Sequence, residues 1–217
     1  FGGESAEHDV SCTTAAHVLR AADRHRYRIT PVGISTEGQW ALAEHAAAAL
    51  LIGPDSIPGR LDPTGTTVSP TPMLADAADS DEITVVLPLL HGPLGEDGTV
   101  QGMLDLAGVA YVGTGVLGSA VAMDKAMAKT VAAAHGIPQA RWLWFREHDI
   151  AADPKAVMKE VADQLGLPVF VKPANMGSSV GVTKAKTVEA VRDAIQVALG
   201  YDEWIVVEEA IVGREIE

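Results

Sequence analysis

The sequence predicts a two-part α/β protein, in which a doubly wound unit with a mostly parallel sheet precedes a smaller α+β unit. Apolar strand-like runs alternate with helical segments up to about residue 115, the pattern of an α/β layer. The later order is strand–helix–strand–turn–strand–helix–strand, which suits an α+β unit. Of the 217 residues, 47% are apolar, enough for one large or two small cores. We place the boundary near residue 120.

The first unit is expected to begin with the tail of a strand over residues 1–3, running into a glycine turn. A helix over 5–22 and a strand over 27–34 follow. An alanine run favours a short helix over 41–51. Residues 53–72 contain five prolines and three glycines, so we expect a long irregular surface segment there.

The rest of the first unit follows the same alternation. A strand is expected over 82–90 and a helix over 99–107, with Gly108 as a left-handed C-cap. A short strand at 111–112 precedes a helical stretch over 115–135, which we expect in two pieces.

In the second unit, strands are expected at 141–145, 169–171 and 204–207. Asp153 and Pro154 form an N-cap and first-turn pair for a helix with Val157, Val161 and Leu165 on one face. A further helix is expected over 187–199.

Charge and cysteine content narrow the class of function. The net charge of −13 argues against nucleic-acid partners and against an anionic membrane surface. Cys12 is the only cysteine, which favours a reducing compartment, so we expect a cytoplasmic protein. No apolar stretch is long enough to span a membrane. Because the chain starts at Phe1 without a methionine and stops at Glu217 within continuing structure, we expect it to be a fragment.

The segment 168–181, PVFVKPANMGSSVG, is the most informative stretch. Its apolar run predicts a buried strand that delivers Lys172 at the strand end, and Pro173 ends the strand. Gly177 and Gly181 let the backbone approach a ligand closely, and the two serines between them add hydroxyls. Such a loop suits an anion, although by itself it also fits an ordinary hairpin turn.

Three further clusters stand at predicted strand ends or turns. The first is GGESAEHDVS at residues 2–11, in which Glu7 also fits a first-turn acid that satisfies the helix dipole. The second is HGPLGEDG at 91–98, in which a lone histidine also fits a structural role. The third is VVEEAIVGRE at 206–215, which by itself also fits a solvated strand end. In open α/β sheets, ligands gather outside the carboxyl ends of strands, where the first two clusters fall.

The order of these blocks identifies the chain as similar to the D-alanine–D-alanine ligase family of the ATP-grasp superfamily. The resemblance rests on GGxSAEHDVS, HGPLGEDGTVQG, MDK at 123–125, VKPxxxGSSVG and EExxxGxE, and it covers essentially the whole chain. It implies a pre-ATP-grasp unit followed by an ATP-grasp unit, and the joining of two D-alanines at the expense of ATP for peptidoglycan synthesis.

The resemblance also implies the substrate-binding residues. Glu7 matches the glutamate that binds the ammonium of the first D-alanine, and Ser178 matches the serine that helps hold Glu7 in place. His91 lies near the same substrate. Lys125 and Lys172 match the two lysines on the nucleotide phosphates.

The remaining implied residues belong to the nucleotide. The turn 177–181, with Gly177, Ser178 and Ser179, matches the loop that closes over the transferred phosphate. Glu208 would accept from the adenine amino group, and the backbone at Glu209 and Ile211 would line the adenine. Glu215 matches the acid on the ribose hydroxyls.

The same resemblance places the Mg²⁺ (or Mn²⁺) ligands downstream of Glu217, so no metal ligand is assigned in this chain. It divides the chain into a substrate-binding domain (1–120), a central subdomain (121–203) and the start of a C-terminal subdomain (204–217), and it implies a homodimer. The polypeptide as written is expected to be inactive alone. A D-alanine–D-lactate or D-serine ligase and a non-catalytic nucleotide-binding module remain alternatives. Glu7 together with His91 argues against a biotin-carboxylase-like protein.

Overall fold

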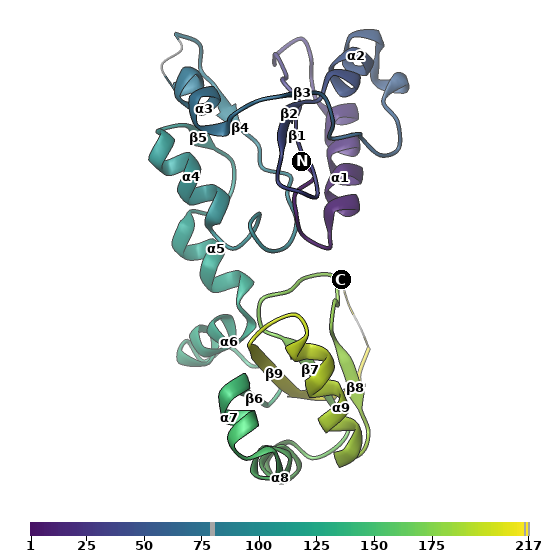
Figure 1. Ribbon diagram of the computed structural model, residues 1–217, viewed down its shortest axis with the longest axis vertical. Helices are drawn as coiled ribbons and strands as arrows, with labels where there is room; N and C mark the ends of the chain where they lie inside the picture. The colour runs from purple at the N-terminus through teal and green to yellow at the C-terminus, as the bar shows by residue number, and fades with distance from the viewer. Residues whose placement is uncertain (79–80, 215, 217) are drawn as a thin grey trace. The chain divides into compact units, whose positions relative to one another are not determined.

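The computed structural model describes residues 1–78, 81–214 and 216, and the chain divides into two compact units, Phe1–Ala120 and Val121–Glu217 (Figure 1). No helix among the described residues is long and apolar enough to cross a membrane.

The first unit contains two small sheets. Strands β1 (Val32–Ile34), β2 (Trp40–Leu42) and β3 (Thr66–Thr67) form an antiparallel sheet in that order. Strands β4 (Val85–Val86) and β5 (Ala110–Tyr111) form a parallel pair. Gly2 adds an isolated parallel bridge to Ile34, so the N-terminal segment extends the first sheet.

Helices pack beside these strands in two cores. Their bounds are α1 (His8–Ala21), α2 (Glu44–Ile52), the 3₁₀ helix η1 (Pro54–Ser56), α3 (Pro70–Ala78), α4 (Thr99–Ala107) and α5 (Val116–Met123). One core joins α1 and α2 through residues that include Ala16, Leu19 and Leu50. The other joins α3 and α4 through Leu74 and Leu104.

The second unit is built on a four-stranded antiparallel sheet of order β6-β9-β7-β8. The strands are β6 (Trp142–Arg146), β7 (Val169–Pro173), β8 (Thr183–Ala185) and β9 (Trp204–Glu209). The helices are α6 (Lys125–Ala134), α7 (Glu147–Ala152), α8 (Pro154–Leu165) and α9 (Val188–Leu199).

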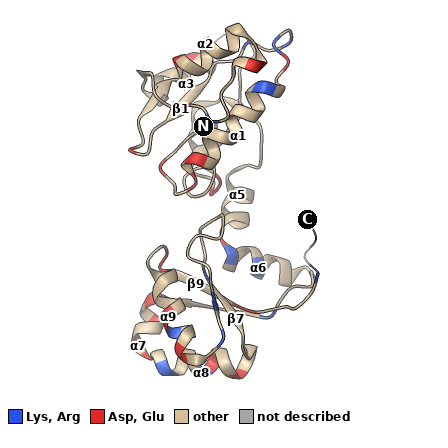
Figure 2. Cartoon of the chain, turned by 90° about the vertical axis from the view of Figure 1, so that its right-hand side faces the viewer, with Lys and Arg blue, Asp and Glu red and all other residues tan. Residues whose placement is uncertain are grey.

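The two faces of this sheet differ in composition, because successive residues of a strand point to opposite faces. Val169 and Val171 of β7 and Ile205 and Val207 of β9 are buried with the apolar stripes of α8 and α9. On the even-numbered face, Val206 packs with Ala126 of α6. Figure 2 shows α6 on one side of β7 and β9 and α7, α8 and α9 on the other. The polar residues Lys172 and Glu208 of these strands therefore lie on the face of the sheet toward α6.

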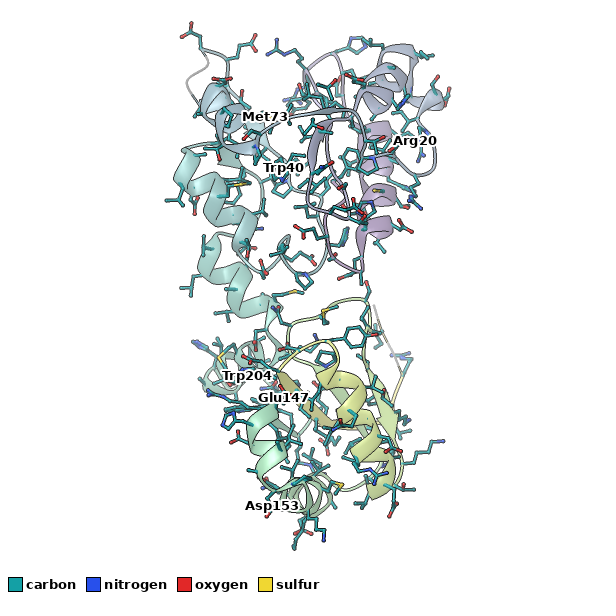
Figure 3. The ribbon with its side chains drawn as sticks, in the orientation of Figure 1. Arg20, Trp40, Met73, Glu147, Asp153 and Trp204 are labelled. Carbon is teal, nitrogen blue, oxygen red and sulfur yellow. The ribbon has the colours of Figure 1, made fainter. Side chains whose placement is uncertain are left out.

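The α/β class is confirmed, and several local predictions hold to the residue. Helix α4 covers 99–107, and Gly108 follows it in the left-handed region with φ 70°. Asp153 lies at the start of α8 (Figure 3), and its carboxylate accepts from the Ala156 N–H as predicted. The Thr187 side chain caps α9 in the same way, which was not predicted.

Other local predictions are wrong. The predicted helix over 41–51 begins only at Glu44, because Ala41 and Leu42 pair with strands on both sides. The predicted strands over 27–34 and 82–90 shorten to three and two residues. Helix α3 starts at Pro70 inside the segment expected to be irregular, and α7 was not expected. The first unit is also less parallel than predicted, since β1, β2 and β3 run antiparallel.

Candidate active site

In the first unit, a glycine turn brings the N-terminal segment against the end of the strand before His91. The backbone N–H of Gly2 donates to the Ser11 hydroxyl at 2.8 Å, and that hydroxyl donates to the Leu89 carbonyl at 2.5 Å. Gly2 and Gly3 have φ values of 89° and 100°, a conformation that glycine adopts without strain. Ser11 is fully buried, so this residue fixes two of the sequence clusters side by side.

A second hydroxyl links the same clusters. The Ser5 hydroxyl donates to the His91 carbonyl at 2.6 Å and accepts from the Glu7 N–H at 3.2 Å. The His91 ring contacts helix α1, with Nε2 3.1 Å from the Thr14 hydroxyl. Ser5 thus links Glu7 to His91, which the resemblance places near the same substrate. The two residues are 84 positions apart in the chain (91 − 7).

The Glu7 carboxylate is buried beside Gly92. Glu7 is 5% exposed and occupies the N-cap of α1 without making a side-chain capping bond. A Cβ atom built on Gly92 would lie 2.5 Å from Glu7 Oε2, so only glycine leaves room for this carboxylate. The position of Glu7 at the start of α1 also remains compatible with the helix-dipole interpretation. A carboxylate in such a buried position can accept charge-assisted hydrogen bonds from an ammonium group.

Acids within the histidine–glycine loop hold its backbone. Glu96 Oε2 accepts from the Gly92 N–H at 2.7 Å, and Asp97 accepts from the N–H groups of Leu94 and Thr99 at 2.8 and 3.0 Å. Burial opposes ionisation of Asp97, but these hydrogen bonds outweigh it and lower the pKa of its carboxyl. Glu96 and Asp97 therefore hold the backbone of this loop by hydrogen bonds. His91 of this loop and Glu7 of the first cluster remain the candidates for substrate contact.

In the second unit, Lys125 begins α6 and reaches the loop that follows β7. Its backbone N–H donates to the Ala174 carbonyl at 2.9 Å. Its ammonium donates to the carbonyl oxygens of Ala174, at 3.3 Å, and of Met176. Burial lowers the pKa of Lys125, and the nearby charge of Lys172 lowers it further. The two lysines predicted to bind phosphate are therefore close enough to repel each other.

Glu208 holds two lysines. Its Oε2 lies 2.5 Å from Lys172 Nζ, across the β7–β9 pair, and its Oε1 lies 3.0 Å from Lys129 Nζ. Burial raises the pKa of Glu208, but the hydrogen bonds and charges of both lysines outweigh burial and leave the pKa below its usual value. The sequence prediction missed Lys129, although its position one helical turn after Lys125 places both on one face of α6. In Figure 2, blue basic segments mark α6 and the neighbouring strands.

The loop after β7 contains three residues in the left-handed backbone region. Ser178 and Ser179 have φ values of 44° and 60°, and Gly181 has φ 71°. Non-glycine residues in this region are uncommon and often mark functional turns. A Cβ atom on Gly181 would lie 2.7 Å from Pro173 Cγ, so this position requires glycine for packing as well. Gly177 accepts from the Val180 N–H at 2.9 Å, which closes the turn.

The predicted adenine-lining residues stand at the end of β9. Both carboxylate oxygens of Glu209 accept from Arg141 at 2.7 Å, one from its backbone and one from its guanidinium. Ile211 follows the strand and is 69% exposed. Glu215 lies outside the described residues.

The contact between Glu7 and Ser178 and the location of the metal ligands stay predictions. Glu7 belongs to the first unit and Ser178 to the second, so their predicted contact stays a prediction. For a metal, the described ranges 1–78, 81–214 and 216 contain no group of three His, Cys, Asp or Glu side chains that could hold an ion.

Comparisons with known proteins show which family this chain resembles. A family profile described as "D-ala D-ala ligase N-terminus" matches residues 1–114, and one described as "D-ala D-ala ligase C-terminus" matches 131–217. The D-alanine–D-alanine ligases of Kineococcus radiotolerans and Nocardia farcinica are 44% and 45% identical over 100% of this chain. The chain covers 61% of each of these relatives.

Solved structures give the same result. The D-alanine–D-alanine ligase of Coxiella burnetii matches with a TM-score of 0.79 and 32% identity, covering 98% of this chain and 63% of that one. The VanG D-Ala:D-Ser ligase of Enterococcus faecalis matches with a TM-score of 0.77 and 32% identity, covering 98% of this chain and 62% of that one.

The lysine-bearing antiparallel sheet and its serine–glycine loop, together with these matches, define an ATP-grasp protein. The accompanying N-terminal unit carries its own acid–histidine cluster and its own profile match. The chain belongs to the D-alanine–D-alanine ligase family. It spans about three fifths of the length of its curated relatives.

Proposed function

We propose that the protein joins two D-alanines to D-alanyl-D-alanine with ATP, for the synthesis of a peptidoglycan precursor. The carboxylate oxygen of the first D-alanine attacks the γ-phosphorus of ATP, and ADP leaves. The amine of the second D-alanine then attacks the acyl carbon, phosphate leaves, and the amine loses a proton. Phosphorylation supplies the leaving group that a carboxylate lacks, so the protein contributes placement and charge neutralisation.

The observation that carries this proposal is the buried Glu7 carboxylate beside Gly92. A buried carboxylate with His91 nearby offers a receptor for the ammonium of an amino-acid substrate. Nucleotide chemistry alone needs no such acid in the first unit.

For the nucleotide, Lys125 and Lys172 would neutralise the phosphates, and Gly177, Ser178 and Ser179 would close over the transferred group. Glu208 would accept from the adenine amino group, with the backbone of Glu209 and Ile211 lining the base. Ser178 would also help hold Glu7, and Glu215 would bind the ribose hydroxyls.

Mg²⁺ is part of the proposal through the family, with ligands expected downstream of Glu217. The bound ion would neutralise phosphate charge. A cytoplasmic location, a homodimer and the division into domains at 1–120, 121–203 and 204–217 also belong to the proposal.

The experiment is phosphate release by the full-length protein with ATP and Mg²⁺. We expect release that depends on D-alanine and does not occur with L-alanine. A well-folded protein without D-alanine-dependent release contradicts the ligase proposal and favours a non-catalytic nucleotide-binding module.

A matched pair of variants tests the substrate site. Glu7→Gln should weaken binding of the first D-alanine by ~10-fold or more while leaving ATP binding within about 2-fold, because one charge-assisted contact is removed. Glu4→Gln, in the same turn but exposed, should leave both unchanged. If Glu7→Gln weakens ATP binding instead, the assignment is wrong.

D-Ala:D-Ser ligation is the second candidate, because the VanG D-Ala:D-Ser ligase matches the same 98% of this chain. Mass spectrometry of products formed from mixtures of D-alanine with D-serine or D-lactate decides between these acceptors. D-alanyl-D-alanine as the dominant product supports the first candidate.

A further inference from the structure

We propose that Lys129 is a positioning residue that holds Glu208 as an anionic acceptor for the exocyclic amine of adenine, and thereby sets the preference for ATP over 6-oxopurine nucleotides. This inference rests on the proposed ATP site and assigns a role to a residue outside the predicted site.

The two oxygens of Glu208 are held by different elements. Oε2 meets Lys172 of β7 at 2.5 Å, and Oε1 meets Lys129 of α6 at 3.0 Å. The side chains of Lys129 and Glu208 are only 17% and 13% exposed, so water screens this pair weakly. Because the two lysines contact different oxygens, one can leave without displacing the other.

Lys129 is anchored at the strand rather than at the phosphate loop. Its Nζ lies 5.9 Å from the ring centroid of Trp142, which is opposite Glu208 in the β6–β9 register. Trp142 packs in turn against the small core formed by Ala126, Ala174 and Val206. Lys129 is thus fixed beside Glu208 by a cation–π contact and a packed helix.

Lys125, on the same face of α6, has different partners. Its ammonium contacts the carbonyl oxygens of Ala174 and Met176 at the start of the loop. The two lysines on this face of α6 therefore have separate partners. Lys125 contacts the loop after β7, and Lys129 contacts Glu208.

This division matters when a nucleotide binds. If Lys172 turns toward a phosphate, Glu208 loses one of its two cations while burial still favours its neutral form. Lys129 then keeps the carboxylate ionised and oriented. An ionised carboxylate accepts from the N6 amine of adenine but repels the O6 carbonyl of guanine or hypoxanthine, whereas a protonated one can donate to O6.

The test measures dissociation constants of the full-length protein for ATP, ITP and inorganic tripolyphosphate by calorimetry. Lys129→Met should weaken ATP binding by ~10-fold, reduce the ATP-to-ITP preference by a similar factor, and leave tripolyphosphate binding unchanged. Lys129→Arg should restore most of the preference. Lys159→Met, which removes an exposed lysine of α8, is the matched control and should change none of the three.

Two further measurements distinguish a positioning role of Lys129 from a direct contact with the phosphates. Lys125→Met should weaken all three ligands together, as expected for a phosphate contact. In Lys129→Met, the ATP preference should fall off at a higher pH than in the wild type, because the pKa of Glu208 rises once a cation is removed.

Several outcomes would overturn the inference. They are an equal loss for all three ligands in Lys129→Met, an unchanged ATP-to-ITP ratio, or a wild type that does not prefer ATP. The ligase proposal fails separately: a protein that prefers ATP through Lys129 but releases no phosphate with D-alanine contradicts only that proposal.

Discussion

The Ser5 hydroxyl donates to the His91 carbonyl at 2.6 Å, joining two loops that lie 86 residues apart in the chain. The same hydroxyl accepts from the backbone N–H of Glu7. One small side chain therefore fixes the spacing between the candidate ammonium receptor and the histidine loop.

Removing this hydroxyl should loosen both loops. We expect Ser5→Ala to lower the free energy of unfolding by about 1 kcal/mol, since one partly buried carbonyl loses its donor. D-alanine binding should weaken while ATP binding stays the same, measured by calorimetry. Thr13→Ala is the control, because the Thr13 hydroxyl makes only an exposed bond within α1. Equal effects of both variants on D-alanine binding would contradict this role for Ser5.

Gly92 should be required for substrate binding because it leaves room for the Glu7 carboxylate, in addition to its backbone conformation. Gly92→Ala places a methyl group 2.5 Å from the Glu7 carboxylate at φ 74°, so both stability and D-alanine binding should fall. Gly108→Ala is matched, because its φ is 70° and a Cβ atom there meets nothing within 4 Å. It should cost about 1 kcal/mol of stability from backbone strain alone and leave D-alanine binding intact. A binding defect in Gly108→Ala would show that strain, not the clash with Glu7, explains the effect.

Glu208 should make stability depend on acid pH. The lysines lower its folded-state pKa below the ordinary value of 4.5, so its ionised form stabilises the fold at neutral pH. This contribution is complete above pH 4.5 and is lost as the pH falls through the lower folded-state value. Urea unfolding of the wild type and Glu208→Gln should therefore differ most above pH 5 and converge in stronger acid. A difference that is constant with pH would contradict the ion-pair origin.

The Asp153 cap should affect stability only. Asp153→Ala removes the acceptor for the Ala156 N–H and should cost about 1 kcal/mol in thermal or urea unfolding. Asp163→Ala, which breaks an exposed pair with Lys159, should cost at most about 0.5 kcal/mol. ATP binding should be unchanged in both. A loss of ATP affinity in Asp153→Ala would connect α8 to the nucleotide site.

Features that depend on neighbours along the chain could be predicted from the residue types. The caps at Asp153 and Gly108 act within one helical turn, so their residue types suffice to place them. The blocks around Glu7, His91 and Lys172 identified the family because they hold several matched residues at fixed spacing.

Features that depend on partners distant in sequence could not be predicted in this way. Ala41 is in a strand despite its alanine-rich surroundings, because β1 and β3 supply hydrogen bonds from both sides. Lys129 appears in the sequence as one more helical lysine. Only the packing of α6 against β9 places it on the second oxygen of Glu208, because ion pairs between elements are set by packing geometry and not by local propensity.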